Sequence, residues 1–535
     1  MTSASGNGDS RRLRGDAIVS FIAQLANSAE TVWLESAREL ILQNDAHAAS
    51  KLLESAVDEH PSSLDLHRSL ASVYMQTGRS LQAENILNAL LLRYPSDASA
   101  AFLLARMLGE QGRSQAMAEV FSALFHPGNE CNDVDLAIAA VELLDDAGKQ
   151  AAAAAICEAQ IAAGSSDARL HAYAGMLQIQ LGEFDIARER YLYAVKNHAQ
   201  AFEWNAAVGL SSLQRYKNVQ HPDLALFKTA LDRSDLNDSA RASVLFALGK
   251  AHDDLENYAQ AAKYFSEANT LVKTDEPWSR KHWHNAIASR LTGRSRSPLK
   301  TFSENWAPIF IVGVPRSGTT LTAELLSRHP GICNRGELPW LPKLERALEL
   351  SGHADLTSLE QARAIYEAHL IQDDRLDAKW FIDKEPLNLL RVDLIMAMYP
   401  NAKIIFCERN PRDTALSLWS QYFSGGVQGY AYDLSDIRAV LDGCRRMKLH
   451  WLALYPDAMR ILRYETLASD PASCLNHLAS WLDLPPYDFS ASAAARASIS
   501  TGSLWQARQP VYTSSIGRWR HYVRHLPDLL KIPDA

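Results

Sequence analysis

The residue types best suited to chemistry lie in a short loop that joins an apolar run to a helix. Residues 309–312 predict a buried strand, and residues 313–318, Gly-Val-Pro-Arg-Ser-Gly, predict a tight loop that opens into a helix at Thr319. Backbone N–H groups and the positive end of a helix dipole converge at such a point and bind phosphate or sulfate. The two glycines have the spacing of a P-loop, but Thr319 stands in place of the P-loop lysine, and the positive charge lies at Arg316 instead.

Three further segments predict strands that end in polar residues. They end at Lys384, Arg409 and Tyr464, and a helix that begins near Pro411 carries Ser417 on its second turn. In open α/β sheets, ligands bind beyond the carboxyl ends of the strands. We therefore expect these side chains to share one crevice with the loop described above.

The first half of the chain repeats a helical pattern. Gly78 and Gly112 lie 34 residues apart, as do Gly148 and Gly182, and small residues and leucines recur around each glycine. A helix, a left-handed turn at glycine or asparagine, a second helix and this period resemble the tetratricopeptide-repeat family. We expect about six or seven repeats between roughly residues 30 and 275. Stacked repeats present a concave surface, which implies a docking role for a peptide or protein, with a plain helical spacer as the alternative.

Composition and charge narrow the class of protein. A chain of 535 residues needs two or more cores, and 47% hydrophobic with 22% charged residues is typical of a globular protein. A net charge of -8, with no basic domain, argues against nucleic-acid binding. The six cysteines form no CxxC pair, which favours a reduced compartment over a disulfide framework or a zinc site. We expect no membrane span, no clear signal peptide and a cytoplasmic location.

Changes of pattern along the chain predict the domain boundaries. We expect a flexible N-terminal segment and lead-in helix at residues 1–29, a repeat array at 30–290, a polar linker at 291–304 and an α/β domain at 305–535. The predicted fold is an all-α solenoid followed by a P-loop-like α/β domain with a parallel sheet.

The loop and the second arginine together resemble sulfotransferases that use 3′-phosphoadenosine 5′-phosphosulfate (PAPS). Residues 315–320, Pro-Arg-Ser-Gly-Thr-Thr, are similar to the family's 5′-phosphosulfate loop, and Arg409 with Ser417 is similar to its 3′-phosphate site. An arginine and a helix-borne hydroxyl suit the phosphate that distinguishes PAPS from ATP. Over roughly residues 305 to 525 the chain looks closest to the tyrosylprotein sulfotransferases and to bacterial proteins that join tetratricopeptide repeats to a sulfotransferase domain.

The resemblance implies roles for individual residues. Glu337 takes the place of the family's general base, and Lys384 and Ser503 take places at the transferring sulfuryl group. Family members often carry two adjacent acids where this chain has Gly336 and Glu337, and often lysine where it has Arg518. The predicted catalytic residues are Glu337, Lys384, Arg316 and Ser503. The predicted donor-binding residues are Pro315, Arg316, Ser317, Gly318, Thr319, Thr320, Arg409, Ser417, Tyr464 and Arg518.

The resemblance implies transfer of a sulfuryl group from PAPS to an acceptor hydroxyl, which leaves 3′,5′-ADP and needs no metal. The leaving phosphate oxygen requires cationic partners and the acceptor requires a base, roles that fall to Arg316, Lys384 and Glu337. The expected acceptor is a tyrosine of a protein or peptide docked with help from the repeats. A glycan, a lipid or a small phenol stays open, as does a homo-oligomer. The alternatives are a P-loop kinase-like phosphotransferase, against which the missing P-loop lysine argues, and an inactive repeat scaffold.

Overall fold

The computed structural model describes this chain as helices and one parallel sheet. The described residues are 22–26, 28–129, 131–275, 278–293, 296–300, 305–351, 355–374, 378–423, 428–490 and 512–534. The chain divides into two compact units, the first ending at Ala147 and the second beginning at Gly148. Most of the predicted N-terminal segment 1–29 lies outside the described residues, and the domain boundary expected at 291–304 stays a prediction.

Helical hairpins build the first unit. Its helices are α2 (Glu30–Leu42), α3 (Ala46–Glu59), α4 (Leu64–Gln76), α5 (Ser80–Arg93), α6 (Ala98–Glu110), α7 (Ser114–Leu124) and α8 (Val134–Asp146). Ser63 and Asp97 cap α4 and α6, because each accepts a hydrogen bond from the N–H group three residues on, at 3.1 and 3.0 Å. Gly78 and Gly112 adopt φ angles of 75° and 73° between paired helices, a conformation in which glycine has no steric penalty. The period of the sequence therefore comes from recurring caps and turns.

The second unit opens with further helices, which fall in or at the end of the repeat array predicted for residues 30–290. They are α9 (Gln150–Ala162), α10 (Ala168–Leu181), α11 (Phe184–Asn197), α12 (Ala206–Ser212), α13 (Pro222–Leu231), α14 (Asp238–Asp254), α15 (Tyr258–Asp275) and α16 (Arg280–Thr292), with the short 3-10 helix η1 (Ala199–Phe202) after α11. Gly182 takes the expected left-handed turn between α10 and α11. Between α14 and α15 the left-handed residue is Glu256, with a φ of 59°, where we expected glycine or asparagine. A hydrogen bond of 2.9 Å from the Asn257 N–H group to the His252 carbonyl closes this turn and holds Glu256 in it.

A five-stranded parallel sheet follows. Its strands are β1 (Ala307–Gly313), β2 (Ile332–Asn334), β3 (Trp380–Asp383), β4 (Lys403–Glu408) and β5 (Met459–Arg463), in the spatial order β2-β3-β1-β4-β5. All neighbouring pairs in this sheet are parallel, and helices connect successive strands. The helices of this part are α17 (Thr319–Leu326), α18 (Trp340–Ser351), α19 (Leu356–Ile371), η2 (Pro386–Arg391), α20 (Val392–Met398), α21 (Pro411–Trp419), η3 (Gly429–Tyr432), α22 (Leu434–Leu454), α23 (Tyr464–Ser469), α24 (Pro471–Trp481), α26 (Trp519–Tyr522) and η4 (Pro527–Lys531). The predicted architecture of a helical array followed by an α/β domain with a parallel sheet is confirmed.

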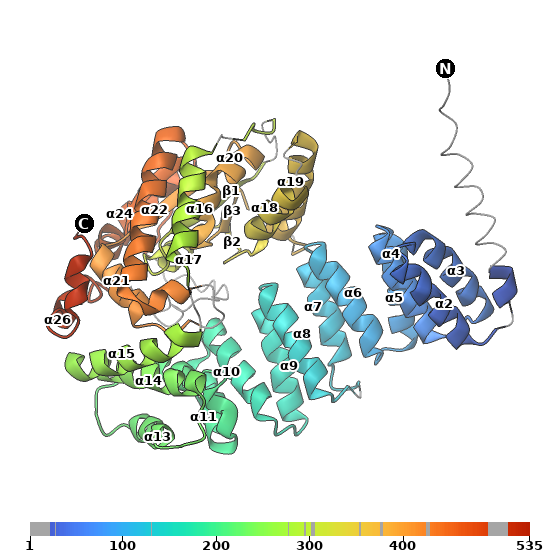
Figure 1. Cartoon of the computed structure of the whole chain (residues 1–535), viewed down its shortest axis with the longest axis horizontal. Helices are drawn as coiled ribbons and strands as arrows, with labels where there is room; N and C mark the ends of the chain where they lie inside the picture. The colour runs from blue at the N-terminus through green and yellow to red at the C-terminus, as the bar shows by residue number, and fades with distance from the viewer. Residues whose placement is uncertain are drawn as a thin grey trace. The chain divides into compact units, whose positions relative to one another are not determined.

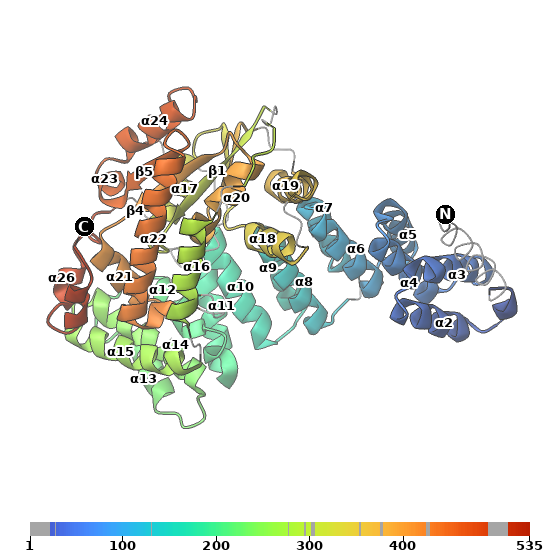
Figure 2. The ribbon, with the colours of Figure 1, turned by 45° about the horizontal axis from the view of Figure 1, so that its top comes forward.

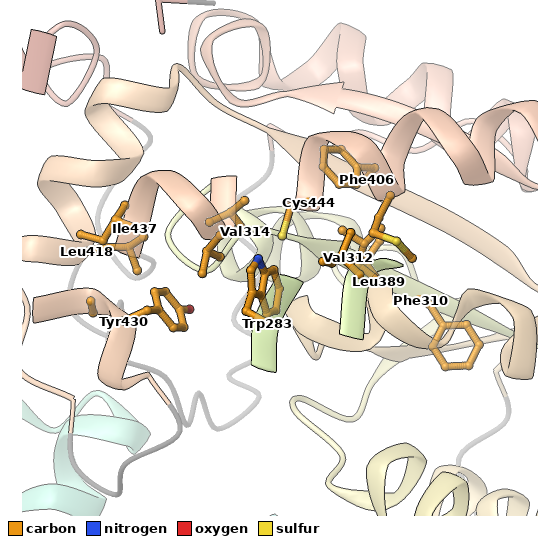
Figure 3. Close-up of a cluster of buried hydrophobic side chains, with 14 of the residues drawn as sticks. Trp283, Phe310, Val312, Val314, Leu389, Phe406, Leu418, Tyr430, Ile437 and Cys444 are labelled. Atoms are coloured by element: carbon orange, nitrogen blue, oxygen red, sulfur yellow. The ribbon is translucent and has the colours of Figure 1, made fainter. Parts of the chain in front are cut away.

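Alternate residues of the central strand β1 belong to two different cores. Ile309 and Ile311 pack in a cluster with side chains of α17 and α24. Phe310 and Val312 pack in a second cluster with side chains of α20 and α22, part of which Figure 3 shows. Because both faces of the sheet are covered, every residue of β1 is buried, which explains its continuous apolar run.

The last helices of the repeat region extend the second of these cores. Phe246 of α14, Phe265 of α15 and Trp283 of α16 belong to the same cluster as Phe310 of the central strand. Helix α16 lies along α22 in Figure 1 and again in Figure 2, and the Trp283 indole N–H group donates to the Ala439 carbonyl at 3.0 Å. Repeat helices and sheet therefore share one hydrophobic core within the second unit.

Gly443 of α22 allows this helix to pack closely against α16. A Cβ atom at Gly443 would lie 2.6 Å from the indole nitrogen of Trp283, so one of the two helices would have to move. We expect Gly443→Ala to lower the free energy of unfolding by about 1–3 kcal/mol, as overpacking of a core usually does. Thermal unfolding followed by circular dichroism measures the change. Leu449→Ala, at an exposed position of α22, is the control and should change stability by at most about 0.5 kcal/mol. An equal loss in both variants would contradict the packing argument.

Candidate active site

The carboxyl ends of the strands lie side by side at one edge of the sheet. Gly313, the last residue of β1, pairs in register with Cys407 near the end of β4. The last residues of β4 and β5 also pair in register, so Arg409 and Tyr464, which follow them, emerge at the same edge. Lys384 follows β3, which lies on the other side of β1. The parallel topology thus gathers the predicted residues around the loop after β1.

The loop after β1 is folded tightly against its neighbours. A Cβ atom at Gly313 would lie 2.6 Å from the Cys407 carbonyl oxygen, and one at Gly318 would lie 2.6 Å from the ring of Tyr464. Gly318 has a φ of 96° and directly precedes α17. Arg316 has a φ of 74°, a left-handed conformation that is uncommon for a residue with a side chain. The loop backbone and the start of α17 are therefore in contact with β4 and Tyr464.

The start of α17 offers groups that can bind an anion. The first N–H groups of an α-helix have no partners within the helix, and the helix dipole favours negative charge beside them. Thr319 and Thr320 are buried at this start. Next to them, the buried hydroxyl of Ser317 has no hydrogen-bond partner among the residues that the structure describes. A buried hydroxyl in this state suits a site that a bound molecule completes.

Two arginines meet beside this loop. Arg316 donates from Nε to Ser417 Oγ at 3.1 Å, and Arg409 donates to the Arg316 carbonyl at 3.1 Å. Arg409 also donates to the Ser515 carbonyl at 2.9 Å, and its guanidinium carbon lies 4.6 Å from the ring centre of Tyr464. Burial, and then the charge of Arg409, lower the pKa of Arg316 to about 10. Two positive charges held this close together favour the binding of an anion between them.

Residues 512–519 place further polar side chains beside Arg316 and Arg409. The Tyr464 hydroxyl and the Ser515 hydroxyl share a hydrogen bond of 2.6 Å. Burial raises the pKa of Tyr512, while the nearby arginine charges act in the opposite direction, which places this phenol in the same cluster. Neither Tyr512 nor Ser515 was among the predicted site residues, and the signal that could have found them is their position just before Arg518.

Arg518 is held by a carboxylate from the repeat region. Its guanidinium lies 2.8 Å from the side chain of Asp253, near the end of α14. Burial alone would lower the pKa of Arg518, but the Asp253 carboxylate raises it above its ordinary value. The N–H groups of Gly517 and Trp519 donate to Asp413 of α21 at 2.6 and 2.9 Å. Asp253 therefore holds the side chain of Arg518, and Asp413 holds the main chain before and after it.

Glu337 and Lys384 form an ion pair at the end of β3. The Lys384 side chain is 2% exposed and the Glu337 side chain 35% exposed, so the buried ammonium group meets a carboxylate that reaches solvent. The Lys384 N–H group donates to the Gly336 carbonyl at 2.7 Å, which ties the two segments together. Burial raises the pKa of the Cys407 thiol to about 12, and the charge of Lys384 acts against this rise, which places Lys384 near the end of β4 as well.

A buried polar network holds the residues around Lys384. Asp383 accepts hydrogen bonds from the Tyr366 hydroxyl at 2.6 Å and from the Asn388 side chain at 3.1 Å. It also accepts from the Glu385 N–H group at 3.1 Å. Burial raises the pKa of Asp383 to about 7, against the opposing effect of the Tyr366 hydrogen bond. A buried network with these partners restricts the conformation of the loop that carries Lys384.

Two regions of the chain match models of known families. Residues 308–488 match the sulfotransferase family, and residues 40–107 match the tetratricopeptide repeat. The chain carries a tetratricopeptide-repeat region followed by a sulfotransferase domain. This confirms the resemblance drawn from the loop, the two arginines and the repeat period.

Several known proteins are similar to this chain. An uncharacterized protein of Aquifex aeolicus is 29% identical over 399 residues, which are 68% of this chain and 51% of that protein. The protein-tyrosine sulfotransferase of Drosophila melanogaster is 28% identical over 196 residues, which are 33% of this chain and 38% of that protein. The chain thus spans about half, or less, of the length of these curated relatives. A solved sulfotransferase domain from the Synechococcus PCC 7002 olefin synthase is 21% identical and covers 42% of this chain and 91% of its own, with a TM-score of 0.31.

The sulfotransferase domain brings the predicted residues into two neighbouring groups. The first contains the loop after β1 with Arg409, Ser417 and Tyr464, and the second contains Glu337 with Lys384. Ser503 lies outside the residues that the structure describes. Within the described ranges, no group of three or more His, Cys, Asp or Glu side chains is placed to hold a metal ion. Nor does any described helix combine the length and the apolar character needed to cross a membrane.

We expect Glu385 to make the stability of the sulfotransferase domain depend on pH. Burial, and then the charge of Glu337, raise the pKa of Glu385 from 4.5 to about 7. The pKa of Glu385 in the folded state lies above its pKa in the unfolded state. Its contribution to the free energy of unfolding is therefore fully present at pH values below the unfolded-state pKa. This contribution is lost as the pH rises through the folded-state pKa.

We expect Glu385→Gln to remove this part of the pH dependence, since glutamine does not ionise. The melting temperature of the variant, relative to wild type, should be higher at about pH 8 than at about pH 5.5. Differential scanning calorimetry at both pH values measures this difference. Glu349→Gln, which changes an exposed carboxylate of α18, is the control and should show no such trend. The same trend in both variants, or none in Glu385→Gln, would contradict the assignment.

Proposed function

We propose that the sulfotransferase domain moves a sulfuryl group from PAPS to an acceptor hydroxyl and releases 3′,5′-ADP. The meeting of Arg316, Arg409 and Ser417 beside the start of α17 carries this proposal. The N–H groups of residues 317–320 suit the 5′-phosphosulfate. Arg409 and Ser417 suit the 3′-phosphate, because a guanidinium and a hydroxyl both donate hydrogen bonds to phosphate oxygens. Tyr464, over which Arg409 lies, supports this part of the site.

In this proposal the domain works by placement and charge stabilisation, as in phosphoryl transfer. The acceptor oxygen bonds to sulfur as the bond between sulfur and the phosphate oxygen breaks, so negative charge grows on that phosphate oxygen. Arg316 and Lys384 offset this charge, and Ser503 remains a proposed second contact to the sulfuryl group. Glu337 takes the proton of the acceptor hydroxyl, and its side chain lies beside Lys384 at the end of β3. No metal takes part.

We propose a tyrosine of a protein or peptide as the acceptor. The relative from Drosophila is named a protein-tyrosine sulfotransferase, and stacked tetratricopeptide repeats present concave surfaces that bind peptides. The solvent-reaching carboxylate of Glu337 suits a base that must meet a large substrate. The six cysteines are all free, which is consistent with the proposed cytoplasmic, reducing location.

Thermal shift tests the donor. We expect 3′,5′-ADP to raise the melting temperature more than 5′-AMP, or ATP with magnesium, since only the bisphosphate engages Arg409 and Ser417 together. A ligand at 100 times its Kd stabilises a protein by about 2.7 kcal/mol. Arg409→Ala should remove most of the difference between 3′,5′-ADP and 5′-AMP, whereas Arg445→Ala, at an exposed position of α22, should preserve it. Stabilisation by ATP alone would favour a phosphotransferase, and no response to any nucleotide would favour an inactive scaffold.

Turnover tests the two catalytic assignments. We expect Glu337→Gln and Lys384→Ala each to lower kcat by roughly 10², about 3 kcal/mol of barrier, because each removes a charge that the transition state uses. Initial rates with labelled PAPS and a library of tyrosine-containing peptides measure the effect at saturating donor. Glu349→Gln is the control and should retain the wild-type rate. Near-normal turnover of Glu337→Gln would rule out its role as the base.

A further inference from the structure

The end of the repeat region contacts the donor side of the sulfotransferase domain. The carboxylate of Asp253, near the end of α14, lies 2.8 Å from the guanidinium of Arg518 and accepts a hydrogen bond from the Tyr522 hydroxyl. Tyr258, at the start of α15, stacks on His521 with ring centres 4.8 Å apart. In Figure 1 the red helix α26 lies beside the green helices α14 and α15. The region around the turn between α14 and α15 therefore anchors the C-terminal segment.

The segment anchored in this way is the one that completes the arginine cluster. The Ser515 carbonyl accepts from Arg409 at 2.9 Å, and the Ser515 hydroxyl bonds with Tyr464 at 2.6 Å. Asp413 fixes the next turn by accepting from two main-chain N–H groups. Residues 515–519 thus bridge the sheet edge and α14.

The positive charges of Arg316, Arg409 and Arg518 give the Asp253 carboxylate of α14 an electrostatic role. After burial, the charges of Arg409 and Arg518 both lower the pKa of Arg316, so the three guanidinium groups share one neighbourhood. Like charges in such a place repel one another, and the repulsion disfavours keeping Arg518 near the other two. Asp253 offsets this repulsion by pairing with Arg518 from outside the cluster.

We propose that Asp253, a residue of the repeat region, is a positioning residue that holds Arg518 and residues 515–519 in the conformation that binds the donor. The identity of the donor rests on the proposed function, whereas the positioning rests on the contacts above. The last repeat is then part of the donor site. A sulfotransferase domain separated from α14 would bind the donor weakly.

Asp253→Asn in the full chain tests this role, because it keeps the size of the side chain and removes its charge. We expect the KM for PAPS and the Kd for 3′,5′-ADP to rise about tenfold, with kcat at saturating donor within about threefold of wild type. Asp253→Glu should restore most of the affinity. Asp254→Asn is the matched control, because the Asp254 carboxylate pairs with Lys250 and the Tyr216 N–H group inside the repeat region. It should leave the Kd for 3′,5′-ADP within about twofold.

Hydrogen exchange of the ligand-free protein separates the positioning role from the proposed function. We expect the Gly517 and Trp519 amides to exchange faster in Asp253→Asn than in wild type or Asp254→Asn, since the segment is held less firmly against Asp413. Unchanged exchange and affinity, or an equal loss in Asp254→Asn, would overturn the positioning role. Faster exchange with unchanged Kd would overturn its link to the donor. Wild-type protein that binds no 3′,5′-ADP would overturn the proposed function, while faster exchange in Asp253→Asn would still support the positioning.

Discussion

The guanidinium groups of Arg316 and Arg409 lie together at the carboxyl edge of a parallel sheet, and the surrounding structure is arranged to keep them there. Arg409 donates to two main-chain carbonyls and lies over the ring of Tyr464, partners that carry no charge. The pKa of Arg316 is lowered by burial and by Arg409, yet at about 10 it leaves the group protonated near neutral pH. Two glycines let the loop approach β4 and Tyr464 closely enough to bring the charges together. The site therefore has positive charge that an anion can neutralise.

Carboxylates from different elements hold the segments that surround this charge. Asp413 of α21 accepts from the main chain before and after Arg518, and Asp253 of α14 pairs with its side chain. Asp383 holds the loop of Lys384 through a largely buried network. Each of these carboxylates has donors close to it, which offset part of the cost of burial and make its geometry specific. The positions of the site residues thus depend on side chains that would not be recognised as functional from their sequence context.

The shared core gives the helices that precede the sheet a structural role in the second unit. Phe246 and Phe265 of the last repeat helices pack in the same cluster as Phe310 of the central strand. A change in these helices is therefore transmitted to the sheet by direct packing, because interiors are close-packed and do not absorb displacements. The match to the tetratricopeptide repeat covers residues 40–107 of the first unit. The later helices α14, α15 and α16 instead share a core with the sulfotransferase domain inside the second unit.

The local units of this fold can be predicted from the order of the residues alone. Apolar runs and glycine positions, which act over a few residues, predict the strand, loop and helix around Arg316. The same signals predict the period of the repeats and the strands that end before Lys384, Arg409 and Tyr464. Which distant groups meet becomes known from the folded chain and not before. Glu337 with Lys384, Ser515 with Tyr464 and Asp253 with Arg518 come from segments far apart in the chain. Their contacts depend on how helices pack on a common core, and local sequence patterns carry no record of that packing. The turn at Glu256 shows the same limit, because backbone hydrogen bonds hold it in a conformation that its residue type does not favour.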